Sequence, residues 1–252
     1  MNTKLLSQKA LSIIEQYNNF VFYNAFCSVP YFNNKTKLIR AGLRVNIGKG
    51  SPKDIYDELR AFAIKNHIDP NSIDNDSLKK ILVDNNIGID CSAYAYYILN
   101  AFSIESSFGQ LDKHLKFTYC KGLVGKLRCK LRPLENCDVI TMSNDKNSHE
   151  IRLDEVNVGD FISFVNSSDD SVRDHIAIVY KVEYQNFKSV KFYITHAAAY
   201  PEDGLYGTGT KNSEITITSP DLAISEQIWS DPALKNRSEI STTTIRRFNW
   251  FK

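Results

Sequence analysis

The chain has 252 residues, of which 42% are hydrophobic and 24% charged, a balance typical of a globular protein long enough to bury a substantial core. Its 31 basic and 29 acidic residues leave a net charge of +2, so no overall field directs it to nucleic acid or to an anionic membrane. No apolar run approaches the roughly 20 residues that span a bilayer. We therefore expect neither a nucleic-acid partner nor a membrane partner.

The N-terminus lacks the uninterrupted apolar core and the small-residue cleavage pattern of a signal peptide. The five cysteines are an odd number, so they cannot all pair within one chain. Both features make a cytoplasmic location the default expectation, with export by a non-standard route left open. Cys120, Cys129 and Cys137 form no C-x-x-C pair and have no histidine pair nearby, so we expect free thiols rather than a metal site. We expect no cofactor.

Helical spacing of apolar residues predicts an amphipathic helix over residues 4–18. Ser51 as N-cap and Asp54 in the first turn predict a second helix over about 51–67. A shorter helix is expected over 77–83, while the glycine-flanked turn just before Ser51 lacks the spacing of a phosphate-binding loop. The first third of the chain is therefore predicted to be helical.

The sequence becomes β-rich after residue 155. Short polar links separate the predicted strands, and such links join antiparallel neighbours rather than strands connected by crossover helices. The arrangement predicts one domain of the α+β class, with N-terminal helices packed on an antiparallel sheet or meander. The predicted strands are 161–165, 175–183, 189–196, 214–218 and 241–248.

Between the helical and β-rich parts, Lys126-Leu127-Arg128-Cys129-Lys130-Leu131-Arg132 alternates strictly between basic and apolar residues. The pattern predicts a strand with four cations on one face. Two interpretations follow. The cations discourage edge-to-edge aggregation of the sheet, or they contact an anionic polymer.

Asp90-Cys91-Ser92 precedes an apolar, aromatic-rich stretch that has few helix breakers. Asp90 is a good helix N-cap, which puts Cys91 at the start of the helix. The positive end of the helix dipole favours a thiolate there, and a thiolate is the better nucleophile. The alternative is a small buried cysteine that happens to follow a cap.

A cysteine nucleophile needs a base, usually histidine, and a group that orients the base. His175 begins one predicted strand, and His196 lies at the end of the next. If these strands are antiparallel neighbours, the two histidines meet at one edge of the sheet. This arrangement would suit a base and its orienting partner.

Together, these segments resemble the NlpC-type cell-wall cysteine peptidases of the papain-like superfamily. The resemblance rests on four segments in order: Asp90-Cys91-Ser92-Ala93-Tyr94, Val158-Gly159-Asp160-Phe161-Ile162-Ser163-Phe164, Asp174-His175-Ile176-Ala177-Ile178-Val179-Tyr180 and His196. It implies a papain-like fold in which Cys91 is the nucleophile, His175 the base and His196 the orienting residue. It also implies cleavage of amide bonds in peptidoglycan stem peptides, with a peptide or peptidoglycan fragment as the partner. The backbone amide of Cys91 would be one oxyanion donor, and Ser92 is a further candidate for contacting the substrate or oxyanion.

The chain departs from the family pattern at three points. Ala93 and Ala177 stand where the family has glycine, and the methyl of Ala93 is expected to narrow the site. The family's tyrosine corresponds best to Tyr31, 60 residues before Cys91, which requires an insertion of two helices. On this interpretation the single domain, 1–252, has an N-terminal helical elaboration over about 1–85 and an insertion over about 103–157.

Two functions follow from these features. The first is a cysteine-dependent peptidase or amidase acting through Cys91, His175 and His196. The second is a catalytically silent papain-like module that holds a peptide or glycan in the same groove, which Ala93 and the missing export signal would suit. The sequence makes no prediction of oligomeric state.

Overall fold

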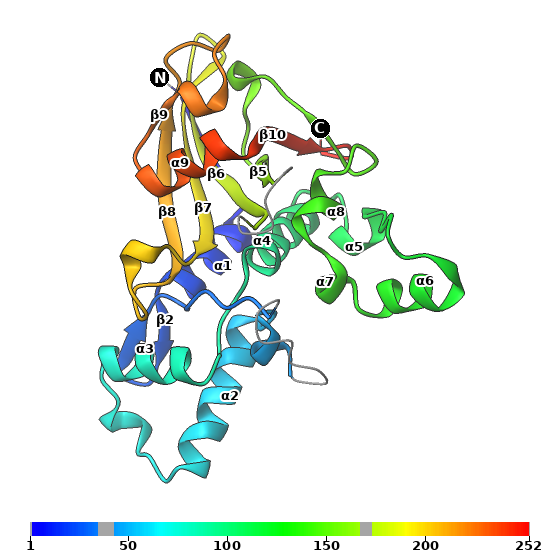
Figure 1. Ribbon diagram of the computed structural model, residues 1–252. Coiled ribbons are helices and arrows are strands. Elements are labelled where there is room, and N and C mark those ends of the chain that lie inside the picture. Colours follow the sequence, from blue (N-terminus) through cyan, green and yellow to red (C-terminus); the bar gives the residue numbers. More distant parts are fainter. Residues whose placement is uncertain (1, 35–42, 167–172, 252) are drawn as a thin grey trace.

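A large antiparallel sheet runs through the computed structural model, which describes residues 2–34, 43–166 and 173–251, and helices pack around that sheet (Figure 1). The predicted α+β class is confirmed. Among the described residues the strand order is β4-β10-β5-β6-β7-β8-β9, with β1 paired to β6, and a separate hairpin joins β2 to β3. The strands are β1 (Asn2–Leu5), β2 (Phe20–Phe22), β3 (Ala25–Cys27), β4 (Ser148–Glu150), β5 (Phe161–Val165), β6 (His175–Gln185), β7 (Lys188–Ala198), β8 (Gly209–Thr216), β9 (Ile228–Trp229) and β10 (Thr242–Phe248).

The helices follow the caps and apolar spacing of the sequence where those signals are strong. Ser51 and Asp54 form a full capping box, and the helix they begin ends at Lys65. Within the described residues, no helix has both the length and the hydropathy needed to cross a membrane. The helices are α1 (Gln8–Asn18), α2 (Pro52–Lys65), α3 (Asn75–Asp84), α4 (Cys91–Glu105), α5 (Leu111–His114), α6 (Gly122–Leu131), α7 (Pro133–Asn136), α8 (Val139–Ser143) and α9 (Pro232–Ile240).

The strand predicted over Lys126–Arg132 is wrong, because residues 126–131 belong to helix α6 and Arg132 is its C-cap. Leu127 and Leu131 are four residues apart and share one helix face as readily as one strand face. Leucine, lysine and arginine are also good helix formers. The leucines are exposed, whereas Cys129 is buried. The alternating basic and apolar residues therefore form a helix whose buried side contains Cys129.

Two of the cysteines expected as free thiols are joined instead. Cys120 and Cys129 form a disulfide with their Cα atoms 6.5 Å apart, within the usual range for such bonds. The turns of α6 bring Cys129 back beside Cys120, and the predicted strand gave no reason to expect these two cysteines to lie close together. Cys137 is a buried free thiol, as expected.

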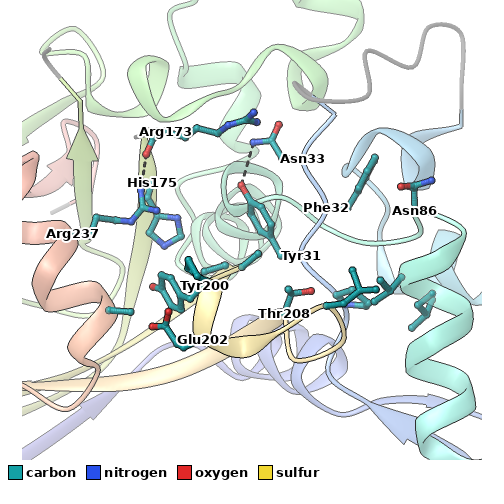
Figure 2. Close-up of a pocket in the computed structure, with 18 of the residues that line it drawn as sticks. Tyr31, Phe32, Asn33, Asn86, Arg173, His175, Tyr200, Glu202, Thr208 and Arg237 are labelled. Atoms are coloured by element: carbon teal, nitrogen blue, oxygen red, sulfur yellow. Dashed lines mark hydrogen bonds between the residues drawn. The ribbon is translucent and has the colours of Figure 1, made fainter. Parts of the chain in front are cut away.

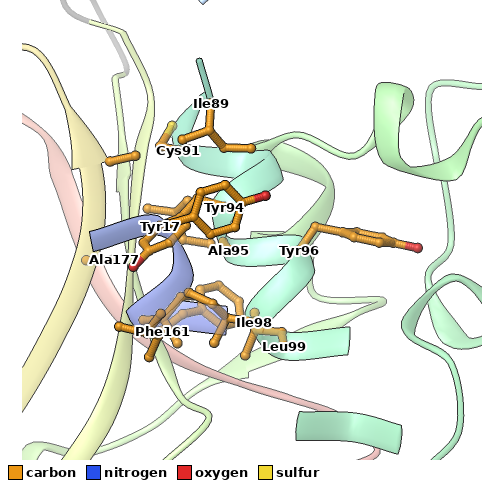
Figure 3. Close-up of a cluster of buried hydrophobic side chains, with 14 of the residues drawn as sticks. Tyr17, Ile89, Cys91, Tyr94, Ala95, Tyr96, Ile98, Leu99, Phe161 and Ala177 are labelled. Carbon is orange, nitrogen blue, oxygen red and sulfur yellow. The ribbon is translucent and has the colours of Figure 1, made fainter. Parts of the chain in front are cut away.

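Helix α4 is the central element of the core. It is apolar on nearly every side, as expected of a helix surrounded by protein. It packs against α1 on one side and against β6 and β7 on another. Figure 3 shows Cys91 at its first turn, followed by the buried side chains of Tyr94, Ala95 and Ile98.

The turn before β5 also contacts this helix. Gly159 has a φ of +86°, and a Cβ added there would lie 2.4 Å from a ring carbon of Phe102 on α4. Only glycine fits this approach without strain. Next to it, the buried carboxylate of Asp160 accepts hydrogen bonds of 2.7 and 2.9 Å from the Arg247 guanidinium of β10. This turn therefore fixes the sheet against the helix that begins at Cys91.

Candidate active site

Asp90 caps α4 as the sequence predicts. Its carboxylate accepts a 2.7 Å hydrogen bond from the backbone amide of Ala93. Cys91 is therefore the first residue of the helix, and only 4% of its surface is exposed. The cap fixes the position of Cys91, while the surrounding core covers its side chain.

Lys49, which lies in a segment that the sequence suggests is a plain turn, completes the cap. Its Nζ lies 2.9 Å from Asp90 Oδ2 and donates a 2.8 Å hydrogen bond to Ser92 Oγ. The Ser92 hydroxyl in turn donates to Asp90 Oδ1 at 2.9 Å. The side chain of Ser92 thus belongs to a buried network at the helix start, rather than to the pocket described below.

Backbone pairing brings distant segments alongside the residues before Cys91. Ile89 donates to the carbonyl of Pro30 at 3.0 Å and accepts from Phe32 at 3.1 Å, which forms a parallel bridge to Tyr31. A Cβ added to Gly88 would lie 2.4 Å from the Pro30 carbonyl oxygen, so this close approach needs glycine. Tyr31 is therefore paired with Ile89, which lies two positions before Cys91, although 60 residues separate Tyr31 from Cys91 in the sequence.

The two strand histidines meet as predicted. Strands β6 and β7 are antiparallel, with Ile178 opposite Thr195. Continuing this register puts His196 opposite Ala177. His175, two residues before Ala177, is then the diagonal neighbour of His196 on the same face of the sheet. His175 Nε2 and His196 Nδ1 are 3.1 Å apart, a hydrogen bond between two buried rings.

The thiolate expected for a cysteine at a helix start is not favoured at Cys91, and the pKa of His175 is shifted as well. Burial is the main cause that raises the pKa of Cys91, to about 12, and the Asp90 carboxylate adds to it. Lys49 and the backbone amide of Ile176 oppose this shift only in part. Burial, followed by the charges of His196 and Arg237, lowers the pKa of His175. The resting site therefore holds a neutral thiol and a neutral imidazole.

A pocket of about 900 Å³ opens beside these groups (Figure 2). His175 and Tyr31 line it, whereas Cys91 and His196 do not. Asn33 donates a 3.1 Å hydrogen bond to the Tyr31 hydroxyl. Burial is the largest cause that raises the pKa of this phenol, and a nearby Cys91 is the second. The tyrosine suggested by the family resemblance thus lies between the pocket and the cysteine.

Two arginines line the same pocket. Arg237, on α9, donates a 2.6 Å hydrogen bond from Nη1 to the backbone carbonyl of Arg173. Figure 2 shows the Arg173 side chain extending toward Asn33, while Arg237 lies on the His175 side. Neither guanidinium forms an ion pair within the part of the chain that the structure describes. The pocket therefore places two guanidinium groups on the side of His175, while the acidic residues Asp84, Asp174 and Glu202 also line it.

The alanines that depart from the family pattern do not face this pocket. Ala93 and Ala177 are fully buried and belong to the hydrophobic core, and neither lines the cavity. The Ala93 methyl therefore does not narrow this pocket, and its effect on the space beside Cys91 stays a prediction. At the third position of the helix, the side chain of Ala93 packs into the core.

Sequence reasoning missed Asp231. This residue is the N-cap of α9, and its Oδ2 lies 3.6 Å from His196 Nε2. It is 35 residues beyond His196, outside every predicted strand and motif. An Asp-Pro pair that begins a helix is the only signal it gives, and that signal indicates a cap rather than a site.

The described residues contain no cluster of three or more His, Cys, Asp or Glu side chains that could hold a metal ion. Comparison with protein-family models, with curated proteins and with solved structures finds no match to this chain.

Proposed function

We propose that the protein is a cysteine-dependent amide hydrolase, a peptidase or amidase, in which Cys91 is the nucleophile, His175 the base and His196 the orienting residue. The observation that carries the proposal is the hydrogen bond between the two buried histidines at the edge of a pocket, next to a capped helix that begins with cysteine. A nucleophile, a base and an orienting group are the parts that covalent amide hydrolysis needs.

The ring nitrogens give each histidine a role. His175 Nε2 bonds His196, so Nδ1 is the nitrogen left to accept the thiol proton. The sulfur attacks the substrate carbonyl as this proton moves to His175, and the resulting oxyanion can take a hydrogen bond from the Cys91 backbone amide. The amine leaves with the proton from His175, and a thioester remains. Water, deprotonated by His175, then hydrolyses the thioester and restores the thiol.

Because Cys91 and His175 are both neutral at rest, the thiolate must form during the reaction. With the pKa of Cys91 raised to about 12 and that of His175 lowered, the thiolate is generated during attack rather than stored as an ion pair. Proton transfer to a positioned base contributes typically 10²–10⁴-fold to rate. The base is therefore expected to be as essential as the sulfur.

The proposed fold is papain-like and the proposed family NlpC-like, with the whole chain forming one domain. Support comes from the arrangement. The cysteine begins a central helix that packs on an antiparallel sheet, and the two histidines follow on adjacent strands of that sheet. The bridge between Tyr31 and Ile89 adds support, since it brings the expected tyrosine to the cysteine across an intervening insertion.

Carboxylate-bearing peptides are the proposed substrates, which includes the peptidoglycan stem peptides that the resemblance implies. Arg173 and Arg237 both line the pocket without an ion-pair partner among the described residues, and guanidinium groups bind carboxylates through charge-assisted hydrogen bonds. Arg237→Gln should raise KM about tenfold for a peptide with a free carboxylate. The same peptide with that carboxylate amidated is the control, and an equal rise for both would contradict this substrate class.

The test of the hydrolase is Cys91→Ala against Cys27→Ala, assayed on peptidoglycan stem peptides and on a panel of peptide amides. Cys27 is a free, half-buried cysteine outside the proposed triad, so its variant controls for the loss of a thiol. We expect the Cys91 variant to lose at least a thousandfold in kcat/KM and the control to keep its activity. Full activity of Cys91→Ala would refute the assignment.

The second candidate function is a silent module that binds a peptide or glycan. The observation that favours it is the 4% exposure of Cys91 together with its raised thiol pKa of about 12, which describes a poor nucleophile. Saturable peptide binding by the wild type, unchanged in Cys91→Ala and without turnover by either protein, would support this candidate over the enzyme.

A further inference from the structure

We infer that Asp231 is a positioning residue that acts through His196 and selects the tautomer in which His175 can work as a base. The catalytic consequence rests on the function proposed above, whereas the tautomer itself can be measured without any turnover. The inference adds a fourth residue, from a separate helix, to the three that the motifs supply.

His196 has one ring nitrogen engaged and one unsatisfied. Its Nδ1 bonds His175 Nε2 at 3.1 Å, while its Nε2 is buried and has no hydrogen-bond partner among the described residues. An unsatisfied buried N–H is unfavourable. The Asp231 carboxylate faces this nitrogen, with Oδ2 at 3.6 Å, which is an ion-pair separation that a small approach would convert into a hydrogen bond.

The position of Asp231 is fixed by its role as a helix cap. Its Oδ1 accepts hydrogen bonds from the backbone amides of Ala233 at 2.9 Å and Leu234 at 3.1 Å. These bonds occupy one carboxylate oxygen and leave the other for His196. The side chain is 17% exposed, so little water competes for that second oxygen.

Asp231 is also the carboxylate among the charged groups that act on His196. The other charged groups are the cations Lys211 and Arg237, which disfavour a proton on the ring. His175 contacts the ring through the hydrogen bond at Nδ1. Tyr200 packs nearby with its ring centre 6.1 Å from that of His196. A carboxylate at Nε2 therefore decides where the single proton of neutral His196 resides.

The tautomer of one ring sets that of the other. With its proton on Nε2, toward Asp231, His196 presents a lone pair at Nδ1 and accepts from the Nε2–H of His175. His175 Nδ1 then carries a lone pair and can take the thiol proton. With the opposite tautomer of His196, His175 would carry its proton on Nδ1 and could not act as a base.

The experiment measures ring tautomers by ¹⁵N NMR and activity by kinetics in the full-length protein, comparing wild type with Asp231→Asn and Asp231→Glu. An asparagine cap still accepts the helix amides through Oδ1, so its NH₂ group faces His196 and favours the wrong tautomer. The matched control is Asp74→Asn, which changes another aspartate N-cap, that of α3, away from the site.

We expect the His196 proton to be on Nε2 in the wild type and in Asp74→Asn, and to move to Nδ1 in Asp231→Asn. We expect kcat of Asp231→Asn to fall 10- to 1,000-fold with KM changed less than threefold, and Asp231→Glu to recover part of the loss. A wild-type proton on Nδ1, or a tautomer unchanged by Asp231→Asn, would overturn the inference. If the wild type hydrolyses no substrate but the tautomer moves as expected, the proposed function fails and the positioning role stands.

Discussion

The buried Lys49–Asp90 pair at the start of α4 gives a quantitative prediction. Lys49→Met removes the charge that lies 2.9 Å from Asp90 Oδ2, while Met retains an unbranched apolar side chain that is only one atom shorter. Both partners are about 90% buried, with side-chain exposures of 10% and 11%. Removing one partner of a buried pair typically costs about 3–5 kcal/mol.

We expect the lower part of that range or slightly less, about 2–3 kcal/mol, because Asp90 keeps its hydrogen bonds from Ala93 N and Ser92 Oγ. For a chain of this length the loss corresponds to a Tm lower by roughly 4–12 °C. Urea denaturation and thermal unfolding measure both values. The same variant should react more slowly at Cys91, because Lys49 lowers the pKa of that thiol.

A double-mutant cycle with Asp90→Asn separates the ion pair from side-chain packing, and we expect a coupling energy of about 1–3 kcal/mol. Lys53→Met is the surface control, because Lys53 forms an exposed ion pair with Asp57 one turn along α2. It should leave the unfolding midpoint unchanged. If Lys49→Met is as stable as that control, Lys49 does not hold the helix start as argued.

Three further predictions concern the site. Burial lowers the pKa of His175 and His196 in the folded state, so the unfolded chain binds more protons at low pH. Stability should therefore be lost as pH falls below about 6.5, by up to ~1.4 kcal/mol per pH unit for each ring. In urea unfolding, the variant with both histidines replaced by glutamine should show a weaker dependence of stability on pH between pH 5 and 7. Burial raises the pKa of Cys27 to about 11, so Cys27 should react with iodoacetamide faster than Cys91, and both reaction rates should rise with pH. A reaction rate of Cys91 that stays constant with pH below pH 7 would instead indicate a thiolate–imidazolium pair. Ala93→Gly should cost about 1–2 kcal/mol of stability with KM unchanged, since the methyl packs in the core, and a lower KM would mean that it does obstruct the substrate.

Local signals in the sequence were sufficient for much of the fold. The Ser51 capping box, the Asp90 cap and the apolar strand at 161–165 depend on residues within a few positions of one another, and all three are confirmed. The meeting of His175 and His196 also follows from sequence, because a short link makes adjacent strands antiparallel and fixes which ends meet.

The prediction of a strand over Lys126–Arg132 was wrong because it also relied on a short local pattern. Seven alternating residues fit one face of a strand, but their leucines also fall at helical spacing. No strand in the described part of the chain pairs with this segment. Periodicity over a short stretch therefore did not distinguish the two structures, and the Cys120–Cys129 bond was missed with it.

By itself the sequence determined which residues could do chemistry: a cysteine at a capped helix start and two histidines on successive strands. Only the tertiary structure decided what surrounds them. Tyr31 and Asp231 reach the site from segments 60 residues before Cys91 and 35 residues after His196, and no local pattern encodes such contacts. The charge state is also a tertiary property. A helix start favours a thiolate, but burial between helix and sheet removes the water that would stabilise it, so the pKa of the Cys91 thiol is raised instead.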